Sequence, residues 1–379
     1  MTGPARLRIG LCAIGVVALG LAVALGGGAA ADAASQSWPP FVLVAGLLAI
    51  GLVANDDGLF EWAAGLLDRL PGGDIVLYVA SMLLVAVVTV FLNLDTSVAF
   101  LTPVLVHVAR RRGAGRNRLL YGCVFMSNSA SLLLPGSNLT NLLVLSREHA
   151  NGASFALRML PAWIAAVIVT TVVVGVLLRD HGNGQREVSE APPRRPGWLG
   201  SAGAGVALVL VIVLVDAAVP VFLVGLSLVA VALLRRRVRP REVWDIIDPL
   251  SLAAIFALAV GMGTIARRWL LPGQLMSRCG SILTAVVAAI LTVLINNLPA
   301  AVLLSTPSPP HARSLLLGLD LGPNLAMTGS LAALIWYRAA RAVGEDPSPL
   351  RYSAVGVVLV PLTLLAALGA QALLGQAGL

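Results

Sequence analysis

The sequence predicts an all-α polytopic membrane protein, with about nine transmembrane helices and two re-entrant hairpins. Three observations predict this class: 58% of the 379 residues are hydrophobic, only 12% are charged, and the mean hydropathy is +0.91. A soluble domain carries roughly 25% charged residues. Half of that charge cannot cover a globule in water, so most of the surface is expected to face lipid.

Apolar stretches recur along the whole chain, and about 20 such residues are needed to cross a bilayer. The first stretch ends in Ala29-Ala30-Ala31 like a cleavable signal peptide, but it is too long for a signal core and is interpreted as a transmembrane helix. The predicted spans are 7–30, 40–54, 118–149 (interrupted), 157–178, 199–216, 219–234, 249–265, 314–342 (interrupted) and 352–376.

Two further apolar stretches, 75–109 and 279–305, are each broken near the middle by polar residues. Each is predicted to enter the membrane and leave on the same side. With the N-terminus in the cytoplasm, this topology places 20 of the 26 arginines in cytoplasmic segments, as the positive-inside rule requires. We therefore expect a multi-pass protein of the bacterial cytoplasmic (inner) membrane. The six remaining arginines are Arg147, Arg158, Arg267, Arg268, Arg278 and Arg313.

A stretch rich in Gly, Pro and charge, 179–198, is predicted to be a cytoplasmic linker between two halves with the same order of elements. The helix at 199–216 is additional, so the second half would start from the opposite face of the membrane. Such inverted-topology repeats are common in secondary transporters. The predicted repeats are 1–178, with hairpin 75–109 and interrupted helix 118–149, and 199–379, with hairpin 279–305 and interrupted helix 314–342.

Four polar clusters lie in the two hairpins and the two interrupted helices. Their Pro and Gly residues free backbone groups, which survive in lipid only inside protein or beside a watery cavity. With the partial positive ends of half-helices, neutral side chains there could hold an oxyanion, a polyhydroxyl solute or a cation. The alternative is that these residues only pack helices together. The candidate substrate-binding residues are Asp95, Thr96, Ser97, Asn128, Ser129, Gly136, Ser137, Asn138, Asn296, Asn297, Asp320, Asn324, Thr328, Gly329 and Ser330.

Asp95 and Asp320 are the candidate proton-coupling residues. An unpaired carboxylate at membrane depth costs several kcal/mol, so it is expected to be protonated, paired or hydrated, and such groups often relay protons. The alternative is that each caps a half-helix. The three cysteines lack metal-ligand spacing, and the chain has no His-Glu-x-x-His, Gly-x-Ser-x-Gly or phosphate-loop motif. We expect no catalytic residues, no metal and no cofactor, so the chain is predicted not to be an enzyme.

The net charge of +8 comes from arginines in short loops between apolar segments. There they set topology and contact anionic lipid, which argues against nucleic-acid binding. The expected partners are membrane lipid and a small inorganic or organic solute, with H⁺ or Na⁺ as the coupling ion.

At the polar clusters the sequence resembles the arsenite/antimonite efflux permeases (arsenical pump membrane proteins). These belong to the ion-transporter superfamily, together with dicarboxylate symporters and sodium/proton antiporters. The matching stretches occur in the family's order between residues 59 and 337. They are Leu59-Phe60-Glu61-Trp62, Asp95 through Pro103, Ala130-Ser131-Leu132 with Ser137-Asn138-Leu139, Asn296 through Pro299, and Asp320 through Pro323 with Gly329 through Ala332.

The resemblance implies a two-repeat fold, a site at the membrane midplane, and export of a trivalent metalloid hydroxide coupled to protons or assisted by a separate ATPase subunit. It would place substrate contacts on Ser137, Asn138, Asn296, Asn297, Gly329 and Ser330, with Asp95 as the ionisable group. A homodimer is left open.

Three positions depart from the family. Asn128 replaces an acidic residue, Asn324 replaces a Lys, and Ala326-Met327 replaces Thr-Pro. These changes remove ionisable groups, so a sodium- or proton-coupled transporter of a carboxylate or inorganic anion is the alternative.

Overall fold

The computed structural model describes residues 3–145, 152–180, 197–214, 216–269, 271–305 and 310–375. Over these ranges the chain is helical and contains no strand, which confirms the all-α class. By length and composition, the helices suited to crossing a membrane are Gly27–Asp56, Asp74–Leu92, Gly152–Leu177, Pro240–Arg268 and Pro349–Leu373. The number of spans and the inverted repeats stay predictions.

The first half begins with α1 (Gly3–Leu25) and the long α2 (Gly27–Asp56). The hairpin predicted over 75–109 is formed by two helices that meet at Asn93, and the predicted interrupted helix breaks between residues 130 and 139. Its last part, 146–149, lies outside the described residues. The elements after α2 are α3 (Leu59–Arg69), α4 (Asp74–Leu92), α5 (Leu94–Arg112), α6 (Arg116–Ala130), η1 (Pro135–Ser137), α7 (Leu139–Leu145) and α8 (Gly152–Leu177).

The second half also contains a hairpin followed by an interrupted helix. Its hairpin turns at Asn296, and its interrupted helix breaks between residues 321 and 331. The elements are α9 (Trp198–Val213), α10 (Ala218–Leu234), α11 (Pro240–Ile247), α12 (Pro249–Arg268), α13 (Leu271–Arg278), α14 (Ser281–Ile295), α15 (Asn297–Leu304), α16 (Ala312–Leu321), η2 (Gly322–Leu325), η3 (Met327–Gly329), α17 (Leu331–Ala342) and α18 (Pro349–Gly375).

Several boundaries differ from the sequence prediction. The helix α2 starts at Gly27 rather than at residue 40, because Pro39 and Pro40 lie inside the helix instead of ending it. The short helices α3, α11 and α13 were not predicted, since each is too short or too charged for a hydropathy search. Most of the predicted linker 179–198, namely 181–196, lies outside the described residues.

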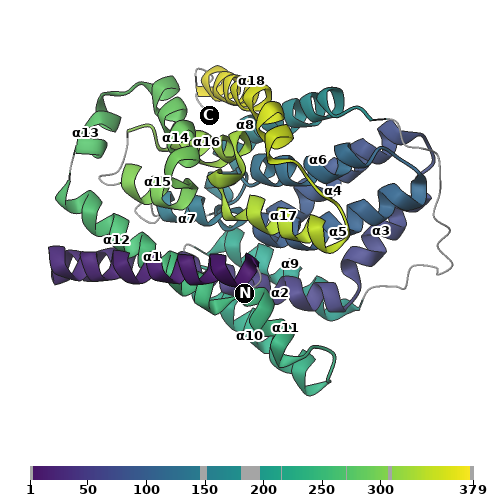
Figure 1. The fold of residues 1–379 in the computed structure, drawn as a ribbon, viewed down its shortest axis with the longest axis horizontal. Coiled ribbons are helices and arrows are strands. Elements are labelled where there is room, and N and C mark those ends of the chain that lie inside the picture. Colours follow the sequence, from purple (N-terminus) through teal and green to yellow (C-terminus); the bar gives the residue numbers. More distant parts are fainter. Residues whose placement is uncertain are drawn as a thin grey trace.

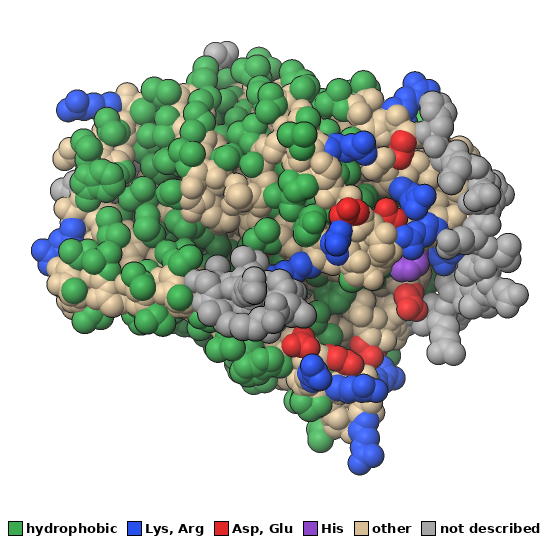
Figure 2. Space-filling view, in the orientation of Figure 1, with side chains coloured by type: hydrophobic (Ala, Val, Ile, Leu, Met, Phe, Trp, Pro, Cys, Tyr) green, Lys and Arg blue, Asp and Glu red, His purple; other side chains and the backbone are tan. Residues whose placement is uncertain are grey.

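The helices pack into one bundle, and the α10–α11 turn projects from it at the bottom of Figure 1. Figure 2 shows hydrophobic side chains over most of this face, with charged side chains gathered on the right and on the projection. Because α8 and α18 expose Leu157, Ile168, Leu365 and Leu373 on their outer faces, these faces are suited to contact with lipid.

Small residues let the helices that surround α2 come close. A Cβ at Gly46 would lie 2.7 Å from the Cα of Phe222, and a Cβ at Gly225 would lie 2.5 Å from the backbone oxygen of Gly46. The contact between α2 and α10 therefore depends on two facing glycines, as is usual where lipid offers no hydrophobic driving force between helices.

Asp57, at the end of α2, connects three elements. Its carboxylate accepts hydrogen bonds from the backbone N–H of Gly200, at 2.7 Å, and from Arg237 Nη1, also at 2.7 Å. Its side chain is only 1% exposed, whereas that of Arg237 is 46% exposed. The carboxylate thus fixes the start of α9 and the end of α10 against α2.

We expect Asp57→Asn to lower the stability of the protein in detergent by about 1–2 kcal/mol, because a charge-assisted hydrogen bond is lost and the amide retains one acceptor. Thermal unfolding followed by circular dichroism measures this. Asp56→Asn is the matched control, since Asp56 is exposed and its removal should change little. Equal melting temperatures for the two variants would contradict the assignment.

Candidate functional site

An asparagine with positive φ forms the tip of each hairpin. Asn93 (φ 99°) joins α4 to α5, and Asn296 (φ 73°) joins α14 to α15. Each side chain caps the second arm: Asn93 Oδ1 accepts from the N–H of Thr96 at 2.8 Å, and Asn296 Oδ1 accepts from the N–H of Leu298 at 3.3 Å. Asn tolerates this backbone conformation better than most residues, and its short side chain satisfies an otherwise free N–H.

The two interrupted helices break in the same way. In the first, a 3₁₀ turn over Pro135–Ser137 leads to the extended residue Asn138, after which α7 begins. In the second, a 3₁₀ turn over Met327–Gly329 leads to the extended residue Ser330, after which α17 begins. Extended residues inside a helical span leave backbone groups without helical partners, so both breaks need other backbone groups, side chains or water as partners.

Side chains from the two halves meet at these breaks. Asn128 Nδ2 donates to Asn324 Oδ1 at 2.8 Å, and Asn138 Nδ2 donates to Asp320 Oδ1 at 2.9 Å. All four residues are at most 3% exposed. Residues separated by more than 180 positions therefore form one buried polar centre, as the sequence interpretation required.

The second hairpin also reaches this centre, because Asn297 Nδ2 donates to Thr140 Oγ1 at 3.1 Å. Asn296 Nδ2 donates to the backbone oxygen of Thr328 at 3.1 Å. In the first half, Ser127 Oγ donates to Ser97 Oγ at 3.3 Å, which connects α6 to the first hairpin. The structure thus brings each hairpin against an interrupted helix.

Ser129 and Ser137 take part in the polar centre less directly. Ser129 Oγ lies 2.8 Å from Thr170 Oγ1 on α8. Ser137 Oγ donates to the backbone oxygen of Val90 on α4 at 3.4 Å.

Four other predicted residues pack between helices or cap a helix, and within the described part of the chain they make no polar contact with the centre. The methyl group of Thr96 packs against Gly51 of α2, and Gly136 faces Val211 of α9. Gly329 lies against Pro323, where a Cβ would come within 2.6 Å of the proline Cα. Ser330 caps α17 by accepting from the N–H of Ala333 at 3.3 Å.

Several buried acceptors of the polar centre have no partner within the described ranges. Four buried oxygens have no hydrogen-bond partner among the described residues: Asn128 Oδ1, Asn141 Oδ1, Asn297 Oδ1 and Asp320 Oδ2. Buried polar atoms are normally satisfied, and one left alone costs about 1–3 kcal/mol. A proton on Asp320, a hydroxyl-bearing solute or a cation would each supply what these oxygens lack.

Asp95 lies apart from this centre and lines a cavity of about 390 Å³, here called the vestibule. Its wall is formed by α2, α5, α11, α12 and α17, and the α17 residues that line it run from Leu331 to Ala342. Eleven helical steps correspond to about 16 Å. The vestibule therefore extends from the beginning of α17, next to the second break, towards the charged end of the bundle.

The charges of the vestibule are mainly negative. Asp95, Asp245 and Asp248 line it, with Arg338 as the single cationic residue among the described lining residues. Asp248 accepts from the Ser251 hydroxyl at 2.8 Å, and Asp245 lies 3.9 Å from Arg241. Such a wall repels anions and attracts protons and cations.

Sequence reasoning missed several members of the polar centre. Thr140 and Asn141 stood in a recognised cluster but were not chosen, and Thr170 and Tyr352 gave no signal inside apolar helices. Tyr352 OH donates to the backbone oxygen of Pro323 at 3.1 Å, so α18 satisfies part of the second break. Within the described ranges, no group of three or more His, Cys, Asp or Glu residues is placed to hold a metal ion.

Comparison with known proteins places this arrangement in a family. The model of the citrate transporter family matches residues 6–328, which is most of the chain. The chain belongs to this family. The citrate transporter family is named for citrate, and that name alone does not assign the substrate of any one member.

Relatives of known name support the resemblance at the polar clusters. The chain is 24% identical to an arsenical pump membrane protein of Escherichia coli over 385 residues, covering 89% of this chain and 86% of the relative. It is 25% identical to an uncharacterized transporter of Mycobacterium tuberculosis over 371 residues, covering 86% and 84%. The resemblance to arsenical pump membrane proteins is thereby confirmed, and the chain is a membrane transporter.

The fold is similar to that of the YdaH transporter of Alcanivorax borkumensis. The two structures superimpose with a TM-score of 0.58 over 99% of each chain, at 12% sequence identity. At that identity the likeness concerns the fold alone. It agrees with the all-helical transporter architecture of this member of the citrate transporter family.

Proposed function

We propose that the protein is a proton-coupled secondary transporter that exports a neutral metalloid hydroxide of the arsenous acid type across the cytoplasmic membrane. The observation that carries this proposal is the combination of an acid-lined vestibule with a polar centre of neutral amides and hydroxyls. Arsenous acid is a small uncharged trihydroxide. Its hydroxyl groups can donate to the unpartnered oxygens of Asn128, Asn141 and Asn297.

The charge of the vestibule argues against the family's named substrate. Citrate carries several negative charges at neutral pH, and it would have to pass Asp95, Asp245 and Asp248. Like charges at short range in a partly buried cavity cost several kcal/mol. A neutral solute meets no such barrier, and protons are attracted to the same surface.

The two carboxylates have separate roles in this mechanism. Asp95, in the vestibule, receives a proton from water and passes through protonated and ionised states as the cavity fills. Asp320, enclosed in the polar centre, holds the proton during the return step, when no solute is bound, because an acid proton satisfies its otherwise unpartnered Oδ2. Alternating access then carries solute and proton in opposite directions.

The alternative is a sodium-coupled carrier of a carboxylate or inorganic anion. The unpartnered oxygens of the polar centre favour it, since Na⁺ binds amide and carboxylate oxygens. The separate ATPase subunit is a proposal that rests on the resemblance, and a homodimer is a further possibility that the sequence leaves open.

We expect expression of the chain in an arsenite-sensitive bacterium that lacks its own pump to raise arsenite tolerance several-fold and to lower cellular arsenic. Arsenic content measured by mass spectrometry checks this, with empty vector as the control. A protonophore should abolish the effect, whereas replacing Na⁺ by K⁺ should not. Unchanged arsenic content in cells with confirmed membrane expression would remove the substrate assignment, and loss of export without Na⁺ would favour the alternative.

A further inference from the structure

A cavity of about 350 Å³ lies where the start of α8, the start of α16 and the end of α18 come together. Its lining includes two guanidinium groups and an imidazole, from Arg158, Arg313 and His311. Hydroxyl groups of serines stand beside them, among them Ser281, whose Oγ lies 3.2 Å from His311 Nδ1. On its inner side are the buried side chains of Phe155 and Leu316, 5% and 0% exposed. This space is called the Arg158 cavity below.

The cationic groups of the Arg158 cavity have no neutralising partner among the residues that the structure describes. Neither Arg158 nor Arg313 makes an ion pair or hydrogen bond with any residue that the structure describes, and the described lining contains no carboxylate. Several arginines elsewhere are paired, as in Arg110–Glu345 at 2.7 Å and Arg111–Asp68 at 2.8 Å. Cations gathered around one cavity repel each other unless an anion joins them.

Topology does not explain these arginines. Arg158 and Arg313 belong to the six that fall outside the arginine-rich cytoplasmic segments of the predicted topology. Arg158 lies near the start of α8, whereas Asp180 follows its end, about 33 Å away along a helix. A positive charge on the disfavoured side of a membrane needs another reason to be kept there.

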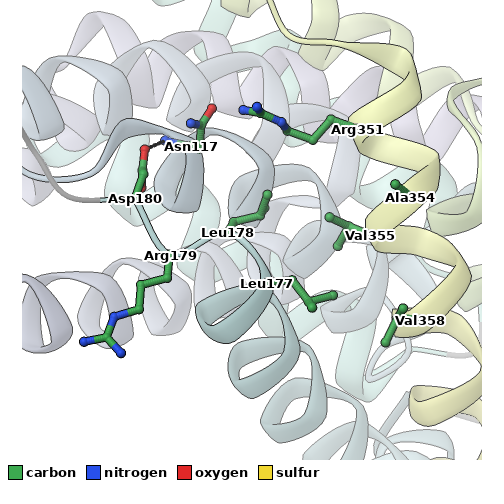
Figure 3. A pocket seen from close by; sticks show the side chains of 9 residues that line it. All are labelled: Asn117, Leu177, Leu178, Arg179, Asp180, Arg351, Ala354, Val355 and Val358. Carbon is green, nitrogen blue, oxygen red and sulfur yellow. Dashed lines mark hydrogen bonds between the residues drawn. The ribbon is translucent and has the colours of Figure 1, made fainter.

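A second cavity, at the other end of the α8–α18 pair, contains both positive and negative charges. Figure 3 shows Asp180 beside Asn117, and Asp180 Oδ2 accepts from the backbone N–H of Asn117 at 2.9 Å. Arg351 points towards Asn117, whereas Arg179 points away from it. Because a carboxylate stands among these arginines, the charge of this cavity is partly compensated, and it is the weaker anion site.

The position of the Arg158 cavity identifies the kind of anion. It lies at the start of α8 and the end of α18, where the apolar residues Leu157 and Leu373, 72% and 74% exposed, adjoin the lining residues Arg158 and Ala372 in the chain. A phospholipid can place its acyl chains along these faces and its phosphate between the two arginines. Arginine pairs well with phosphate oxygens, and basic pockets between transmembrane helices bind anionic lipid headgroups.

We propose that the Arg158 cavity binds the headgroup of an anionic phospholipid, phosphatidylglycerol. The phosphodiester lies between Arg158 and Arg313, and the glycerol hydroxyls contact the serine hydroxyls. A zwitterionic phosphatidylethanolamine is disfavoured, because its ammonium group would meet cations and find no carboxylate among the described lining residues.

Native mass spectrometry of the full chain in detergent tests this proposal, with dioleoyl phosphatidylglycerol and dioleoyl phosphatidylethanolamine as probes. We expect the wild type to bind phosphatidylglycerol about tenfold more tightly, a difference of about 1.4 kcal/mol. The variant Arg158→Gln/Arg313→Gln should lose this preference. The matched control is Arg235→Gln/Arg236→Gln, two exposed arginines on the α10–α11 turn, and it should keep the preference.

Three outcomes would overturn the proposal. They are equal binding of the two lipids to the wild type, retained preference in the Arg158→Gln/Arg313→Gln variant, and displacement of phosphatidylglycerol by excess inorganic phosphate, which would mark a site for small anions. If the double variant does not fold, the single variants Arg158→Gln and Arg313→Gln decide the question. Each side chain is exposed, and each single variant should show an intermediate loss of preference.

Discussion

Asp320→Asn is expected to abolish proton-driven transport while leaving solute binding in place. Asp320 is fully buried, and its Oδ1 accepts from Asn138 while its Oδ2 has no hydrogen-bond partner among the described residues. An asparagine amide has the same shape as the acid but does not ionise, so the variant loses the proton-binding group and keeps a neutral polar site. Such a carrier can exchange solute but has no proton to carry in the opposite direction.

Proteoliposomes with an imposed pH gradient measure the effect with labelled arsenite. We expect the ratio of arsenite concentrations that the pH gradient sustains across the membrane to fall by about 100-fold, which corresponds to about 2.7 kcal/mol. Arsenite exchange without a gradient should stay within about twofold, a change of about 0.4 kcal/mol. A purely structural role for Asp320 would reduce both rates together.

Asp95→Asn is the comparison, and its effect on accumulation should be smaller because Asp95 is partly open to the vestibule. Retained pH-driven accumulation in Asp320→Asn would refute the coupling role.

Gly356→Ala is expected to destabilise the protein and stop transport, although the change adds only one methyl group. A Cβ at Gly356 would lie 2.0 Å from the backbone oxygen of Asn324 and 2.9 Å from its carbonyl carbon. Backbone atoms cannot move aside as a flexible side chain can, so α18 must shift away from η2 (Gly322–Leu325). That shift breaks the hydrogen bond from Tyr352 to Pro323 and loosens the second break. Overpacking of this kind costs about 1–3 kcal/mol.

The same helix supplies the control. A Cβ at Gly369 would meet nothing within 4 Å, so Gly369→Ala should raise helix stability by up to about 1 kcal/mol. The two substitutions are chemically identical and are expected to change the melting temperature in opposite directions. Thermal unfolding of both variants in detergent, together with arsenite exchange, provides the measurement. A stable, active Gly356→Ala variant would show that α18 does not support the break.

The sequence alone predicted the parts of the fold that depend on apolar length and on Pro, Gly and Asn. Both hairpins and both breaks lie where the polar clusters placed them, because a cluster of polar residues and helix breakers is costly in a lipid-crossing stretch unless the helix turns or is interrupted there. Pro39 and Pro40 misled the prediction of α2, since neighbouring helices can shelter the backbone groups that a proline frees.

The pairing inside the polar centre could not be predicted. Whether Asn128 meets Asn324 or Asn138 meets Asp320 depends on how two helix pairs cross, and spacing along the chain does not encode that crossing. Asp95 and Asp320 looked alike in sequence, each a single carboxylate in an apolar stretch. Only tertiary packing separates them, one in the vestibule and one enclosed.

The three carboxylates of the vestibule also affect which small molecules the proposed exporter would leave inside the cell. Most small metabolites, inorganic phosphate among them, are anions, and if the protein exports a metalloid hydroxide as proposed, a pathway open to these anions would lose nutrients with each turnover. An acidic entrance turns such molecules away by long-range repulsion before they reach any contact specific to the cargo. In that mechanism, repulsion in the vestibule excludes anions, so the polar centre of neutral amides and hydroxyls does not have to exclude them itself.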